Sequence, residues 1–164
     1  MTSTASSLRN MLLASVLVMS AGPCLAAGPT IASEADLQFG RFIASAALPT
    51  RVTVSTSGGR TTDNGVLLAG ESPQPAQFAV SGVSNAIFQA AISLGFSGPS
   101  GVSLQSPTAT CGAGSTFMSG VLSGCQFSPT GTATIHVGGT LVVDAGRAST
   151  SVSAFNAITV QVSN

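Results

Sequence analysis

The chain contains a single histidine, His136, and one of its few carboxylates, Asp144, follows in the same stretch, ATIHVGGTLVVDAG. An imidazole near a carboxylate can serve as a general base or contribute to a metal site. One histidine cannot hold a metal ion unaided, however, and the other acids do not gather around it in the sequence. His136 lies between Ile135 and Val137, so in a strand it points to the opposite face, and we predict it to face solvent or lie at a sheet edge. The stretch is therefore predicted to be structural.

Other catalytic patterns are missing. A Ser-His-Asp triad stays open on sequence grounds because its members can come from anywhere in a chain, but there is no G-x-S-x-G elbow. The chain has no lysine, which excludes a P-loop and Schiff-base chemistry. The run Asp63-Asn64-Gly65 lacks the carboxylate series of an EF-hand and predicts a turn. We therefore predict no catalytic residue, no cofactor and no metal site, and a protein that is not an enzyme.

The N-terminus has the three-part layout of a secretory signal peptide, predicted over residues 1–26. One positive charge, Arg9, precedes the uncharged apolar run MLLASVLVMSA, and GPCLAA supplies small residues for cleavage after Ala26 or Ala27. The apolar run is shorter than the roughly 20 residues that a membrane-spanning helix needs. Cys24 raises the alternative of a lipid anchor, but Pro23 stands where such signals normally carry a small residue, so Cys24 is assigned to the removed segment. The mature protein is expected in the periplasm, on the outer surface or outside the cell.

The composition limits the partners of the mature chain. Only 6% of the residues are charged, against roughly a quarter in an ordinary globular protein. A nucleic-acid surface needs clustered basic residues, and the few scattered arginines cannot supply one. Sugar-binding surfaces usually present Trp or Tyr, and the chain has neither. The low charge does not indicate disorder, because large apolar residues recur in regular patterns.

Two cysteines remain after the predicted cleavage, Cys111 and Cys125, in CGAGSTFMSGVLSGC. An even pair in an exported chain predicts a disulfide. A metal site would need a histidine or further thiols near by, and a redox pair would need closer spacing.

Alternating apolar residues joined by glycine-rich turns predict an all-β fold. The pattern begins at LQFGRFI, continues through Val52, Val54, Phe78 and Val80, and ends in FNAITVQVSN; for AIFQAAISL a short helix is not excluded. Residues 95–129 are the least regular, and Gly138-Gly139 is expected to bend or turn the chain. We predict a single antiparallel β-sandwich over residues 36–164, preceded by a short N-terminal extension at residues 27–35.

The order of these motifs resembles the bacterial secreted family called domain of unknown function 4402. Its members have an early L-x-F-G, a T-V-T-V strand, an A-x-F-x-V-x-G strand and a V-G-G-T-L hairpin, which DLQFG, RVTVSTSGG, PAQFAVSG and IHVGGTL resemble here. The resemblance implies an immunoglobulin-like or pilin-like sandwich with no established catalytic residues. Members often have G-x-Y-x-G before the last strand, where this chain has STSVSAF, Ser149 to Phe155.

The expected function is therefore that of an exported structural or surface-interaction protein of the cell envelope, for example a fimbrial or adhesin-type subunit. Its expected partners are copies of itself or other envelope subunits, joined by strand pairing, with no nucleic acid, no transmembrane helix in the mature chain and no small-molecule substrate. The alternative is a monomeric secreted or periplasmic module that recognises a glycan or host surface through loops such as residues 95–128. An enzyme is the third and most remote possibility.

Overall fold

The computed structural model describes residues 28–70, 72–96, 98–147 and 158–163, and every regular element in them is a β-strand. The predicted signal peptide and the STSVSAF stretch lie outside the described residues. The twelve strands are β1 (Thr30–Ala35), β2 (Phe42–Ala44), β3 (Thr50–Val54), β4 (Arg60–Asp63), β5 (Gly65–Leu67), β6 (Ala76–Ser81), β7 (Ile87–Leu94), β8 (Val102–Thr110), β9 (Thr116–Met118), β10 (Val121–Gln126), β11 (Thr132–Val143) and β12 (Ile158–Ser163). The all-β prediction is confirmed, and the short helix considered for AIFQAAISL is strand β7 instead.

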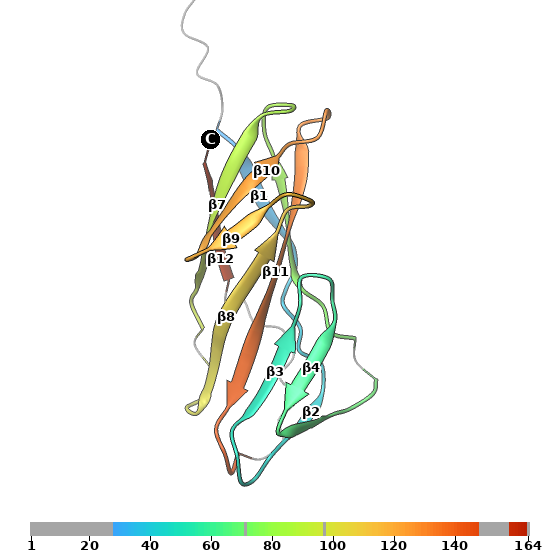
Figure 1. Ribbon diagram of the computed structural model, residues 1–164, viewed down its shortest axis with the longest axis vertical. Helices are drawn as coiled ribbons and strands as arrows, with labels where there is room; N and C mark the ends of the chain where they lie inside the picture. The colour runs from blue at the N-terminus through green and yellow to red at the C-terminus, as the bar shows by residue number, and fades with distance from the viewer. Residues whose placement is uncertain (1–27, 71, 97, 148–157, 164) are drawn as a thin grey trace, which may run out of the picture.

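The strands form three antiparallel sheets. The largest has the order β1-β6-β11-β3-β4, with β8 also paired to β11, and the second has the order β12-β7-β10-β9. A small sheet pairs β2 with β5. In Figure 1 the molecule is elongated, with the four-stranded sheet beside the upper part of the large sheet and β2, β3 and β4 toward the lower end. The fold is thus a sandwich whose large sheet extends beyond its smaller partner.

Strand β11 is the strand on which the large sheet is built. Its first half, from Thr132 to Val137, pairs with β6, and its second half, from Gly139 to Val143, pairs with β3. Strand β8 lies along its other side, from His136 to Val143. The change of partner from β6 to β3 falls at Gly138. A turn at the two glycines is excluded, because residues 132–143 form one continuous strand. The alternative of a bend agrees with the register shift in the β11–β8 ladder between Gly138 and Thr140.

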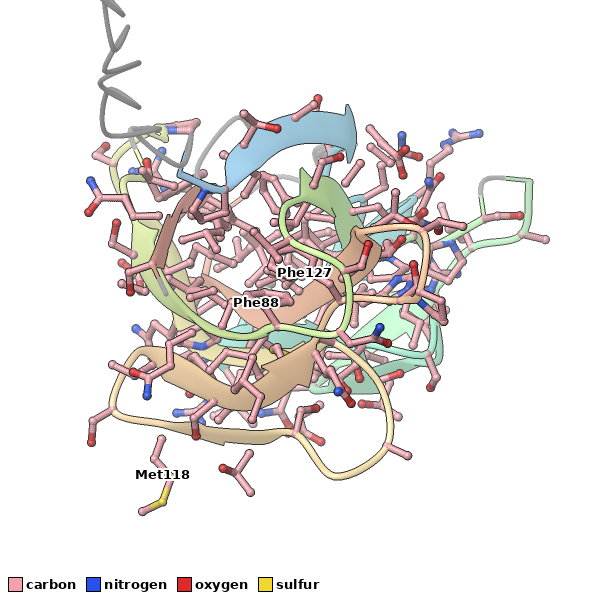
Figure 2. The ribbon with its side chains drawn as sticks, turned by 90° about the horizontal axis from the view of Figure 1, so that it is seen from above. Phe88, Met118 and Phe127 are labelled. Atoms are coloured by element: carbon pink, nitrogen blue, oxygen red, sulfur yellow. A yellow bond between two sulfur atoms is a disulfide. The ribbon has the colours of Figure 1, made fainter. Side chains whose placement is uncertain are left out.

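The core follows the predicted alternation. From Ile135 to Val143 of β11, every second residue along the strand is buried, and these residues share one face. Strands β6 and β7 show the same period of two. Phe88 and Phe127 stack with ring centroids 4.3 Å apart. Figure 2 shows both side chains in the interior of the sandwich. Leu37 and Phe39 are fully buried directly after β1. A face of Val, Ile and Phe side chains on each sheet therefore supplies the hydrophobic stabilisation of the sandwich.

Two boundaries differ from the sequence analysis. Residues 30–35, assigned there to an extension preceding the domain, form β1 and pair with β6. Residues 95–129, expected to be the least regular part of the domain, contain β8, β9 and β10. Strand β1 gave no pattern because Ile31 is its one large apolar residue and its residues from Thr30 to Glu34 are all exposed. Strands β8 and β10 bury Leu104 and Leu122, but Ser, Gly and Gln surround these side chains and make the alternation short.

The predicted disulfide is confirmed and links the two main sheets. Cys111 follows β8 of the large sheet, Cys125 lies in β10 of the four-stranded sheet, and their Cα atoms are 5.7 Å apart. The hydroxyl of Ser115 hydrogen-bonds to Thr110 Oγ1 and donates to the carbonyl of Gly112, which orders the turn after Cys111. Since Cys125 is buried in the core, the bond joins the sheets from inside.

Removing this disulfide should loosen the contact between the sheets. The double substitution Cys111→Ser with Cys125→Ser is expected to lower the free energy of unfolding by about 2–5 kcal/mol, the usual cost in a small exported domain. Urea denaturation of the oxidised protein and of the variant measures the difference, and reduction of the wild-type protein should reproduce most of it. Equal unfolding midpoints for the oxidised and reduced proteins would contradict this assignment.

The close approach of three strands at Gly138 should tolerate no side chain. A Cβ atom there would collide with the carbonyl oxygen of Val54 and lie 2.8 Å from Thr108 Oγ1. Gly138→Ala should therefore cost about 1–3 kcal/mol of unfolding free energy, as overpacking does. Gly139→Ala is the matched control, because its Cβ would meet the flexible end of Leu104 at 3.3 Å. A larger loss at Gly139 than at Gly138 would refute this explanation of the glycine pair.

Candidate functional site

His136 lies in the interior of the large sheet and not at an edge. Its neighbours in the ladder are Gln77 of β6 on one side and Thr110 of β8 on the other. The side chain points away from the buried Ile135 and Val137, as predicted, but it is half-buried rather than freely exposed. Its Nδ1 atom is buried and has no hydrogen-bond partner. The predicted alternative of a sheet edge is wrong, because β6 and β8 flank β11 at this residue. The predicted direction, away from the core face, is as expected, although the side chain is half-buried there.

Asp144 lies at the far end of the same strand. It follows Val143, the last residue of β11, so roughly 26 Å of extended chain separate it from His136 at about 3.3 Å per residue. It is exposed, and its backbone N–H donates to the carbonyl of Gly101. Arg147, close by, donates to Ser100 Oγ at 2.8 Å. His136 and Asp144 therefore lie too far apart to form a catalytic pair.

The described residues contain no cluster of metal-ligating groups. In residues 28–70, 72–96, 98–147 and 158–163, no three side chains of His, Cys, Asp or Glu come together in a possible ligand set. The same part of the chain contains no helix with the length and apolar character needed to cross a membrane.

An apolar hollow of about 440 Å³ lies at the small sheet, lined by Ile43, Ala44, Ser45, Leu48, Asn64, Gly65 and Val66. Beside it, Thr50 is fully buried; its Oγ1 accepts a hydrogen bond from the N–H of Ser45 and donates to the carbonyl of Asn64. Arg60 holds the small sheet to β4 by donating to the carbonyls of Phe39, Arg41 and Leu68. No charged residue lines the hollow; Ser45 and Asn64 are its polar side chains, and the others are apolar or Gly.

The four-stranded sheet carries no charge on any of its strands. The sequences of β7, β9, β10 and β12 contain no Asp, Glu, Lys or Arg. Three large apolar side chains are exposed on it: Ile87 at 69%, Met118 at 75% and Val121 at 41%. In Figure 2 Met118 points away from the molecule. The face is therefore a neutral surface of apolar, Ser, Thr and Gln side chains, without the charges that usually keep a sheet face solvated.

Two edge strands lie on one side of the sandwich. Strand β1 ends the large sheet and β12 ends the four-stranded sheet; the two approach each other without pairing. The ladder of β12 with β7 runs without a bulge from Ile158 opposite Leu94 to Ser163 opposite Gln89. Strand β1 is interrupted by a register shift between Ser33 and Ala35. Within the described residues, both strands leave one row of backbone groups without a strand partner, which is the feature that permits strand addition.

One of these two strands was predicted from the sequence. The alternation in ITVQV predicted β12, but neither the strand at residues 30–35 nor the hollow was expected. Sequence gave little signal for either, because Ile31 is the only large apolar residue of β1. Ile43, Leu48 and Val66 gather only because β2 pairs with β5. The loop surface considered for residues 95–128 is largely strand.

Comparison with known proteins gives one match. Residues 30–162 match the model of the family described as domain of unknown function (DUF4402). No curated protein and no solved structure matches the chain. The match begins at the first residue of β1, so the family domain includes the strand that the sequence analysis placed outside the sandwich.

Replacing His136 should change the stability little. His136→Ala removes a buried nitrogen without a partner and also some ring contacts, so the two effects oppose each other and the unfolding free energy should change by about 1 kcal/mol or less. Ile135→Ala is the matched contrast, because truncating this fully buried neighbour should lower the free energy of unfolding by about 2–5 kcal/mol. Urea denaturation compares the two. Loss of a bound metal ion or of a hydrolytic activity in His136→Ala would show instead that this strand carries chemistry.

Proposed function

The chain belongs to the DUF4402 family, and from this premise we propose that it is an exported structural protein of the cell envelope that acts by associating with other subunits and not by catalysis. The disulfide supports export, since such bonds persist mainly in oxidising compartments. A fimbrial or adhesin-type subunit is the most specific form of this proposal. Copies of the same chain are the proposed partners, alone or with other envelope subunits.

The observation that carries the proposal is the unprotected edge of β12. Soluble proteins usually blunt an edge strand with a lysine, a proline, a bulge or very short length. Strand β12 has six residues, an unbroken register, and none of these devices. Its side chains also fix it firmly, since Val160 is only 8% exposed. It therefore presents an ordered row of backbone donors and acceptors that a strand from another subunit can pair with.

The neutral face beside this edge supports association between identical copies. Identical copies that meet through a charged face bring like charges together, which opposes their association. The strands of the four-stranded sheet carry no charged side chain, so this repulsion is absent there. The outer faces of β12 and β7 carry Thr159, Gln161, Ser93 and Gln89. These short or neutral polar side chains allow a neighbouring strand to approach. In the absence of such association the protein would be the monomeric binding module.

The purified mature protein should self-associate in a concentration-dependent way. Thr159→Lys with Gln161→Lys, which places two lysines on the exposed side of the edge strand, should shift the equilibrium toward monomer. Sedimentation velocity over a range of concentrations measures this.

The matched control is Gln89→Lys with Ser93→Lys, which adds the same charges on the same face but on β7, one strand inward. Weaker association in the β12 variant than in the β7 variant is the expected result. A wild-type protein that stays monomeric at every concentration would contradict the proposal and favour the binding module.

A further inference from the structure

Strand β1 is held in the sandwich almost entirely by its backbone. Its residues from Thr30 to Glu34 are all exposed. Ile31 and Ser33 pair with the buried Val80 and Phe78, so they share the inward side of the sheet, yet Ile31 remains 38% exposed. By contrast, the edge strand of the other sheet buries Val160. Strand β1 therefore contributes a ladder of hydrogen bonds to β6 and little apolar contact.

The chain becomes firmly anchored immediately after this strand. Leu37 and Phe39 have no exposed surface, and Gln38 forms two backbone hydrogen bonds with Gln74, at 2.8 and 3.0 Å. The register shift in the β1–β6 ladder leaves Glu34 without a counterpart, close to this anchor. A bulge weakens the ladder locally. The junction between the loosely packed strand and the fixed core therefore lies within residues 34–36.

Opening at this junction would free β1 without disturbing the core. Elements with few buried apolar contacts are those that open locally at low free-energy cost. In the described part of the chain, β1 is joined to the domain only through residue 36, so its other end need not thread past any strand. Once β1 leaves, the edge of β6 offers the same backbone groups to any strand of suitable sequence.

We propose that β1 is exchanged between copies, so that the β1 strand of one molecule pairs with β6 of a second copy of this chain. This inference rests on the proposed function and adds a second contact between copies, the β1–β6 ladder of the large sheet, to the pairing proposed at the β12 edge of the other sheet. The second copy offers the same β6 edge in the same register, so every backbone hydrogen bond lost within one molecule is regained between two. When each copy gives β1 to the next and the rotation does not close, the product is a filament.

A cross-linking experiment tests the exchange directly. Ala32 and Ala79 are opposite each other in the β1–β6 ladder, on the face away from the buried Phe78 and Val80. Full-length mature protein carrying Ala32→Cys is mixed with protein carrying Ala79→Cys, incubated at high concentration and then oxidised. A disulfide joining residues 32 and 79 of different molecules, identified by peptide mass mapping, forms efficiently only when β1 of one copy lies on β6 of the other.

The matched control is a mixture of Arg51→Cys and Asp63→Cys proteins. These residues are exposed and opposite each other in the β3–β4 hairpin, whose tight turn between Val54 and Arg60 prevents exchange. We expect a several-fold excess of the 32–79 cross-link over the 51–63 cross-link. Equal yields would overturn the exchange of β1. If the yields are equal while the wild-type protein still self-associates, the proposed function stands and only the exchanged strand is wrong; if self-association is also absent, both fail.

Discussion

The close packing of backbone at Gly138 is the constraint on which the rest of the structure depends. One twelve-residue strand, β11, pairs with β6 over its first half and with β3 over its second half, while β8 lies along its other side. Strands β6 and β3 follow each other along the same side of β11, and at the point where one replaces the other a Cβ atom on Gly138 would collide with the carbonyl oxygen of Val54. A glycine at this point allows the carbonyl of Val54 to approach the strand. The upper sandwich and the lower sheet are thereby joined without a linker.

Stability is distributed unevenly over this framework. The two main sheets are joined from inside by the stacked Phe88 and Phe127 and by the disulfide between Cys111 and Cys125. Alternating apolar residues of β6, β7 and β11 complete this contact. Strand β1 lies outside it, with exposed side chains on a ladder of backbone hydrogen bonds. A rigid centre with one weakly held edge is a suitable arrangement for a subunit that keeps its fold while it exchanges contacts.

The low charge has a different consequence at the core and at the surface. In the core it matters little, since apolar side chains would occupy those positions in any sandwich. On the four-stranded sheet it removes the usual protection against association, because neither lysines nor acids interrupt the face or the β12 edge. The described charges lie elsewhere, and Arg60, Arg147 and Asp144 take part in hydrogen bonds through side chain or backbone. A protein without lysine is therefore better suited to packing than to electrostatic recognition.

The sequence by itself determined the fold class, the core faces of most strands and the disulfide. Period-two alternation at Val52 and Val54, or along β7, is a local signal, since a strand buries one face whichever strand it pairs with. The disulfide was likewise predicted without knowledge of the fold, from an even pair of cysteines in a chain expected to be exported. Tertiary structure decided what depends on pairing between distant segments. Only the ladders show that Gly138-Gly139 continues a strand, that His136 lies between β6 and β8, and that Asp144 is far from it. Strand β1 was hidden for the same reason: it is formed by hydrogen bonds to β6, and backbone groups are identical in every sequence, so residues 30–35 carried no pattern that could reveal it.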